Sequence, residues 1–159
     1  MAGAALDGPV VVGTIAADAT LPLRQRVLRP HQRMDEVRFP GDDDADSRHL
    51  GAFDTDGRLV GIGSLMRQPP PWAADDSSAW RLRGMATDET MRGKGVGAAV
   101  LTAAIGHVAG AGGGRLWCNA RVPAVGFYRH FGLCPVGEEW EEPDIGPHIA
   151  MELWVQAGR

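Results

Sequence analysis

The chain has 159 residues, of which 44% are hydrophobic and 23% charged, and its formal net charge at pH 7 is −4. This length and composition are typical of one globular domain with a full core, and the negative charge argues against a nucleic-acid partner. No apolar run approaches the roughly 20 residues that span a membrane, and the first residues lack the features of a secretory signal. We therefore expect a single domain over residues 1–159, ordered beyond about residue 8, cytoplasmic, and without a membrane partner.

The two cysteines, Cys118 and Cys134, are too few for a disulfide framework or a metal cluster. We expect both to be reduced, buried thiols, as is usual in the cytoplasm, and we expect no metal site.

In the first half of the chain, apolar patterning predicts three strands, at residues 10–15, 48–53 and 59–66. A short helix is predicted over residues 21–28, ending before Pro30. Residues 31–47 are polar, and the acidic run 42–46 is expected to be a solvated loop. His49 is expected to be a packed histidine rather than a catalytic one.

Three arginines lie around the predicted helix 21–28: Arg24, Arg26 and Arg29. They are expected to be solvated charges or ion pairs at the edge of the core. The alternative is that one of them lines a substrate cleft.

The second half alternates strands and helices. Four strands are predicted, at residues 80–86, 116–119, 136–142 and 148–155. The helix 94–109 is apolar nearly all round, as expected for a helix buried against a sheet, and Gly132 ends a second helix that starts at Pro123. A strand–helix–strand unit requires a parallel pair, and the hairpins make the sheet mixed, so the predicted fold class is α+β.

The glycine-rich loop before helix 94–109 is the most informative stretch. It reads Arg92-Gly93-Lys94-Gly95-Val96-Gly97 and places three glycines at alternate positions. The first N–H groups of a helix have no intrahelical partner and carry partial positive charge, so this end of the helix can bind an anion such as a diphosphate.

Three phosphate-binding patterns compete for this loop. A Walker loop needs a hydroxyl residue after the lysine, where this chain has Gly95. A dinucleotide fingerprint needs a different glycine spacing and a carboxylate after the next strand, which has none. The third pattern, R/Q-x-x-G-x-G/A, fits at every fixed position, and a glycine-rich helix start without a ligand remains the structural alternative.

A second motif follows in Asn119-Ala120-x-x-x-Ala124-x-x-Phe127-Tyr128-x-x-x-Gly132-Leu133. The two motifs, in this order and at this distance, resemble the GNAT N-acetyltransferase superfamily over residues 80–134. The stretch from Gly137 to Met151 resembles its ElaA-like subgroup. Leu133 replaces a common phenylalanine, and Gly84-Met85-Ala86 replaces a bulkier run, which leaves the acyl length open.

The resemblance implies a GNAT-like mixed, splayed sheet of six to seven strands with about four helices. It implies that the pantetheine arm of acetyl-CoA lies between strands 80–86 and 116–119, bound by backbone near Met85 and Ala86. The diphosphate is then expected on the loop residues Arg92, Gly93, Lys94, Gly95, Val96 and Gly97. Asn119 is expected either to bind the pantetheine arm or to complete a strand edge.

Acyl transfer from a thioester to an amine needs a neutral amine and a proton for the departing thiolate. The resemblance places Tyr128 near the coenzyme sulfur as that proton donor; the alternative is a structural tyrosine. His148 is the candidate base, although a water chain or simple packing explains the residue equally well. The last hairpin also carries Glu138, Glu139, Glu141 and Glu142, a weak hint of a cationic amine.

The sequence thus predicts an N-acetyltransferase that transfers acetyl from acetyl-CoA to a primary amine of a small molecule or protein in a ternary complex. A non-catalytic acyl-CoA-binding regulatory module is the alternative, and a nucleotide-binding domain is a third reading. The acceptor and the oligomeric state, including a homodimer, stay open.

Overall fold

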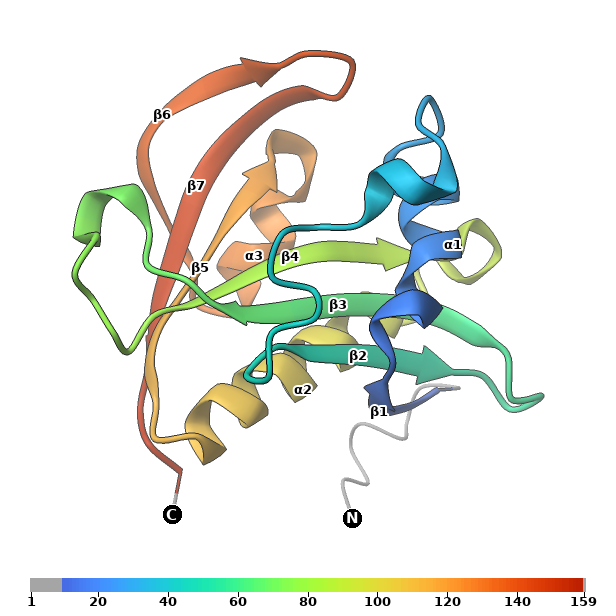
Figure 1. The fold of residues 1–159 in the computed structure, drawn as a ribbon, viewed down its shortest axis with the longest axis horizontal. Coiled ribbons are helices and arrows are strands. Elements are labelled where there is room, and N and C mark those ends of the chain that lie inside the picture. The colour runs from blue at the N-terminus through green and yellow to red at the C-terminus, as the bar shows by residue number, and fades with distance from the viewer. Residues whose placement is uncertain (1–9, 159) are drawn as a thin grey trace.

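The computed structural model describes residues 10–158, so the expectations about the first eight residues lie outside the described residues. A seven-stranded mixed sheet runs in the order β1-β2-β3-β4-β5-β7-β6 (Figure 1). The strands are β1 (Val11–Ile15), β2 (Arg48–Phe53), β3 (Leu59–Arg67), β4 (Trp80–Thr87), β5 (Gly114–Arg121), β6 (Cys134–Glu142) and β7 (Gly146–Val155).

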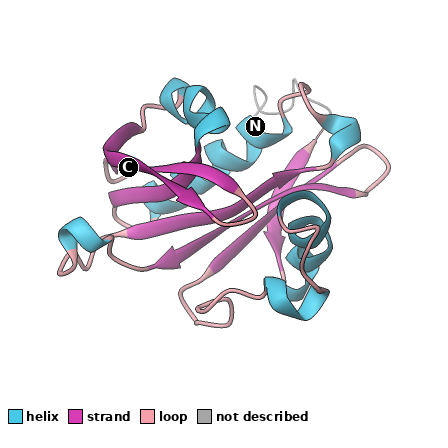
Figure 2. Cartoon of the chain, turned by 90° about the horizontal axis from the view of Figure 1, so that it is seen from above, coloured by secondary structure: helices cyan, strands magenta, loops and turns pink. Residues whose placement is uncertain are grey.

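Three α-helices flank the sheet, where the sequence predicted about four helices; the remaining helical segments are short turns. The helices are α1 (Leu21–Leu23), α2 (Val96–Gly110) and α3 (Val125–His130). A π-helical turn, Arg24–Leu28, continues α1. Figures 1 and 2 show helical segments on both faces of the sheet, with α1 on the face opposite α2. Among residues 10–158, no helix is long and apolar enough to cross a membrane.

The sheet is splayed at its one parallel pair, as predicted. Strands β4 and β5 pair only at Trp80↔Leu116 and Arg81↔Trp117. Beyond these pairs β5 continues its ladder with β7 alone, as far as Arg121↔His148. The two central strands therefore separate toward their carboxyl ends and leave a gap between them.

A β-bulge in β4 lies beside this gap. Ile62 pairs with Ala86 and Ser64 with Arg83, so one residue of β3 faces two of β4. One of those two is Gly84, whose φ is +68°. A Cβ at Gly84 would lie 3.0 Å from the Phe39 ring, so both the backbone conformation and the close packing require glycine here.

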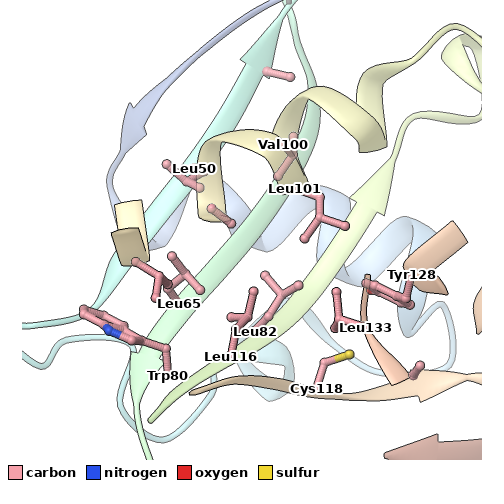
Figure 3. Packing of buried hydrophobic residues seen from close by; sticks show 14 of the residues in the cluster. Leu50, Leu65, Trp80, Leu82, Val100, Leu101, Leu116, Cys118, Tyr128 and Leu133 are labelled. Carbon is pink, nitrogen blue, oxygen red and sulfur yellow. The ribbon is translucent and has the colours of Figure 1, made fainter. Parts of the chain in front are cut away.

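The main core lies between the sheet and helices α2 and α3 (Figure 3). Val96, Val100 and Leu101 of α2 are almost completely buried. The helix can approach β3 closely because β3 has glycines at the contact: a Cβ on Gly61 would lie 2.4 Å from the Val96 side chain. The prediction that this helix is buried against a sheet is confirmed.

The opposite face carries a buried polar network, which corrects the expectation of a solvated acidic run. The Arg24 side chain is fully buried and donates to both carboxylate oxygens of Asp42, at 2.7 and 2.9 Å. Arg24 also donates to Ser64 Oγ at 3.0 Å, and His49 Nδ1 lies 2.7 Å from that same oxygen. Asp42 folds inward because it is the counterion of a buried arginine, whereas the four residues after it are exposed.

The cysteine prediction is half correct. Cys118 is buried, whereas Cys134 is exposed at the start of the outer strand β6. An edge strand has one neighbour and little covering it, which explains the exposure.

Candidate active site

The glycine-rich loop forms an open helix start. Gly95 is the N-cap of α2 in a left-handed conformation (φ +82°), and Gly93 is also left-handed (φ +76°). No side chain of residues 10–158 caps the helix, and its first turn contains no acidic residue. A Cβ added to either glycine would have no non-neighbouring atom within 4 Å. The first amides of α2 are therefore available to an anionic ligand, which is the arrangement a diphosphate needs.

The other predicted loop residues divide between solvent and core. Arg92 and Lys94 are exposed and supply positive charge beside the amides. The Val96 side chain is buried in the core, so this residue offers a ligand its backbone alone. A Cβ on Gly97 would make ordinary contact with Phe127, at 3.5 Å. The loop therefore offers an anion free backbone amides and two exposed cationic side chains.

A cavity of about 270 Å³ lies at the gap between β4 and β5. Some of its lining residues, including Leu82, Cys118 and Tyr128, belong to the core on the α2 side. Others, including Phe39 and Arg83, lie on the α1 side, where Phe39 contacts the guanidinium groups of Arg24 and Arg83. The cavity therefore connects the two faces of the sheet through the gap.

Tyr128 lines the cavity from α3. The residue is 7% exposed, and its ring lies edge-on to Phe127 with 5.2 Å between the centroids. Burial, and then the neighbouring Cys118, raise the pKa of Tyr128 far above its usual value. The phenol is therefore protonated at every physiological pH and can donate a hydrogen bond or a proton but cannot act as a base.

Cys118 lies beside Tyr128 near the gap (Figure 3). Burial raises the pKa of the Cys118 thiol to about 12, although the positive charge of Arg81 opposes this shift. The nucleophilic form of cysteine is the thiolate, so at neutral pH this thiol is unreactive.

His148 lines the cavity from β7. Its Nδ1 lies 2.9 Å from the carbonyl oxygen of Gly146, which can only accept, so Nδ1 carries the hydrogen. Nε2 is then the atom that can accept a proton. The ring also stacks on Trp140 of β6, with 5.7 Å between centroids. His148 therefore packs against Trp140 and also has a nitrogen, Nε2, that can accept a proton.

The predicted site residues lie in three places in the structure. Met85, Asn119, Tyr128 and His148 line the cavity. Ala86 does not line it but packs in a small cluster with Leu23 and Ile62. The loop 92–97 lies apart from the cavity lining, at the start of α2.

Arg29 lines the cavity, in agreement with the alternative that one arginine around the first helix lines a cleft. Sequence reasoning missed other lining residues, above all three arginines: Arg81, Arg83 and Arg121. Arg81 and Arg83 alternate with Trp80 and Leu82 on a central strand. Charged side chains on a strand with neighbours on both sides must face a cavity or a counterion, and that signal could have identified them.

The comparisons with known proteins agree with this architecture. The chain matches the Acetyltransferase (GNAT) family over residues 14–133. It is 38% identical over 148 residues to the uncharacterized N-acetyltransferase YitI of Bacillus subtilis (strain 168), a match that covers 93% of this chain and 98% of that protein.

Solved structures show the same fold. The Escherichia coli protein ElaA superposes with a TM-score of 0.71 at 21% identity, covering 90% of this chain and 98% of its own. A GCN5-related N-acetyltransferase from Kribbella flavida superposes with a TM-score of 0.71 at 19% identity, covering 92% and 98%.

A splayed α+β sheet with an open helix start and a cavity through its gap is the architecture of an acyl-CoA-dependent acyltransferase. The chain belongs to the GNAT acetyltransferase family and is an N-acetyltransferase. Among residues 10–158, no cluster of three or more histidine, cysteine, aspartate or glutamate side chains is arranged to hold a metal ion.

Proposed function

We propose that the protein transfers an acetyl group from acetyl-CoA to a primary amine of a small molecule or peptide by direct attack in a ternary complex. The observation that carries this proposal is the cavity connecting both faces of the sheet beside an open helix start. Donor and acceptor can enter from opposite faces and meet in the gap. Holding two reactants in this way contributes roughly 7–11 kcal/mol toward the barrier.

The coenzyme is assigned to the α2 side of the sheet. Amides of residues 93–97, with Arg92 and Lys94, would hold the diphosphate, and backbone near Met85 and Ala86, with Asn119, would hold the pantetheine arm. Bound there, acetyl-CoA supplies an acetyl group activated as a thioester. The β4 bulge supports this assignment because it interrupts the ladder at Met85 and so leaves backbone groups for a ligand.

The proton transfers are assigned to His148 and Tyr128. His148 Nε2 would take the proton of the amine, directly or through water, since Nδ1 is occupied by Gly146. Tyr128 would give a hydrogen bond or proton to the leaving sulfur, since burial keeps the phenol protonated. The neutral thiol of Cys118 disfavours an acyl-cysteine route and supports direct attack.

Four finer statements belong to the same proposal: one acyltransferase domain over residues 1–159, membership of the ElaA-like subgroup, a cytoplasmic location and a homodimer. Two cysteines without a disulfide, one of them exposed, are consistent with a reducing compartment. Light scattering of the purified chain measures the oligomeric state directly.

Calorimetric titration with acetyl-CoA tests the proposed coenzyme site. Gly95→Glu places a carboxylate where the diphosphate is expected, and Gly106→Glu is the matched control, because Gly106 is exposed on the same helix with open space around it. We expect affinity to be lost in the first variant and kept in the second. Equal affinity in both would refute the loop assignment, and binding without thiol release on any amine would favour the non-catalytic module.

A further inference from the structure

The cavity is strongly cationic on one face of the sheet. Four arginines line it, from the turn after α1 (Arg29), from β4 (Arg81 and Arg83) and from β5 (Arg121). Among the lining residues the structure describes, Glu142 is the sole carboxylate.

Arg83 forms no ion pair with any residue that the structure describes. Its guanidinium lies 3.9 Å from the centroid of the Phe39 ring, and its Nε is buried without a hydrogen-bond partner within residues 10–158. The nearest buried carboxylate, Asp42, is bound through both oxygens to Arg24. Arg24 itself lies 3.8 Å from the Phe39 centroid, so the ring that supports Arg83 is shared with a second cation.

The neighbouring arginines are also under-bonded. Arg29 Nη1 and Arg81 Nε are buried without a partner in the described part of the chain. Glu142 forms no ion pair within 4 Å with any described residue, and its Oε2 accepts from Trp140 Nε1 at 3.2 Å. Arg121 donates to the backbone carbonyl of Leu28 at 2.8 Å, which satisfies a donor but leaves its charge unbalanced.

Unpaired guanidinium groups in a partly desolvated cavity are energetically unfavourable, and an anion that accepts their hydrogen bonds relieves the penalty. The pKa values of these arginines are lowered accordingly. Burial, and then the like charges of Arg81 and Arg24, lower the pKa of Arg83 to about 10. Burial also lowers the pKa of Arg29, Arg81 and Arg121. All four remain charged at neutral pH.

We propose that the acceptor amine carries an anionic oxygen group, a carboxylate or a phosphate, and that Arg83 and Arg29 bind this group. The planar guanidinium presents paired donors that match both kinds of anion. The inference rests on the proposed function, because it names the acceptor of that reaction. It replaces the cationic amine suggested by the acidic hairpin, since Glu138, Glu139 and Glu141 are exposed and do not line the cavity.

The test is a rate comparison between paired acceptors with and without the anion, with each rate expressed per neutral amine. Thiol release from acetyl-CoA is measured with amino acids against their carboxamides, and with phosphoethanolamine against ethanolamine. We expect kcat/KM to be at least 10-fold higher for the anionic member of one pair. The pair that shows the difference distinguishes carboxylate from phosphate, and a preference for the uncharged members or for diamines would overturn the inference.

The variant Arg83→Gln tests whether the preference for anionic acceptors arises from the arginines of the cavity. It should lower kcat/KM for the anionic acceptor by about 10- to 100-fold, as expected for loss of a charged hydrogen bond. The loss with the uncharged analogue should be much smaller, so that the ratio of the two kcat/KM values falls, and the melting temperature should not fall. Arg58→Gln, at the exposed β2–β3 turn, is the matched control and should behave as wild type. An equal loss for both acceptors would contradict the role of Arg83.

A binding measurement separates this inference from the proposed function. Calorimetry with the anionic amines and no acetyl-CoA should detect binding to the wild type that Arg83→Gln weakens. If no amine of any charge is acetylated, the proposed function fails, and this titration alone decides whether the anion site exists. Binding that is unchanged in Arg83→Gln would refute the site.

Discussion

Replacing Tyr128 by phenylalanine removes one hydroxyl from the cavity and tests the proposed proton donor. The substitution keeps the aromatic ring that packs in the core, so the fold should stay intact. We expect the free energy of unfolding to change by less than about 1 kcal/mol, or about 3 °C in melting temperature for a chain of this size. The affinity for acetyl-CoA should also be unchanged.

The effect on turnover follows from the leaving group. Positioned acids contribute roughly 10²–10⁴-fold, and a thiol with a pKa near ~8.5 is a leaving group that needs modest help. We therefore expect kcat of Tyr128→Phe to fall by about 100-fold, equivalent to ~2.7 kcal/mol in the barrier.

The pH profile adds a second, independent check. Because burial raises the pKa of Tyr128 far above its usual value, the phenol should not titrate within an ordinary assay range. Stopped assays of thiol release from pH 6 to 9.5 should thus give the same shape of pH–rate profile, alkaline side included, for the wild type and for Tyr128→Phe. Wild-type kcat in the variant across several amines, or a lost alkaline limb, would refute the assignment of Tyr128 as the acid.

Three further changes probe the rest of the site. His148→Gln should lower kcat/KM for the amine by about 100-fold while calorimetry shows unchanged acetyl-CoA affinity, and an unaltered rate would favour a water relay as the base. Asp42→Asn leaves Arg24 buried without a counterion and should destabilise the fold by about 3–5 kcal/mol, or ~9–15 °C by calorimetric melting. Burial alone would raise the pKa of Asp42, but the hydrogen bonds from Arg24 and the Phe39 amide outweigh burial and lower it. The stability that Asp42 contributes is therefore present above its unfolded-state pKa and is lost as the pH falls through its folded-state pKa. A melting temperature within 3 °C of wild type would contradict that reading. Gly84→Val forces a branched side chain into positive φ against Phe39 and should cost about 1–3 kcal/mol, with a matching loss of acceptor affinity; a neutral result would mean that the bulge relaxes.

Local sequence patterns were sufficient to predict the glycine-rich loop, the helix that follows it and the parallel pair of strands. The glycines of the loop 92–97 predicted an uncapped helix start. A left-handed backbone and free amides depend on neighbouring residues in the sequence, so this feature can be predicted from a short stretch. The apolar helix that follows predicted burial against a sheet, and the single crossover required the parallel pair at which the sheet splays.

The partners of the buried polar residues could not be predicted from local patterns. Asp42 looked solvated because its counterion, Arg24, is 18 positions away in the sequence. Arg83 is paired in regular register with Ser64 of β3, and the bulge follows it at Gly84 and Met85. The alternation of Arg81 and Arg83 with apolar residues is visible in the sequence, but the Phe39 ring that Arg83 contacts comes from a distant segment and is known only from the folded chain.

The central claim is that donor and acceptor meet in the gap between β4 and β5, and a crystal structure with coenzyme A bound tests it most directly. The account predicts the diphosphate on the amides of residues 93–97 and the thiol in the gap beside Tyr128. Coenzyme bound elsewhere, with the gap between the two strands closed, would contradict it.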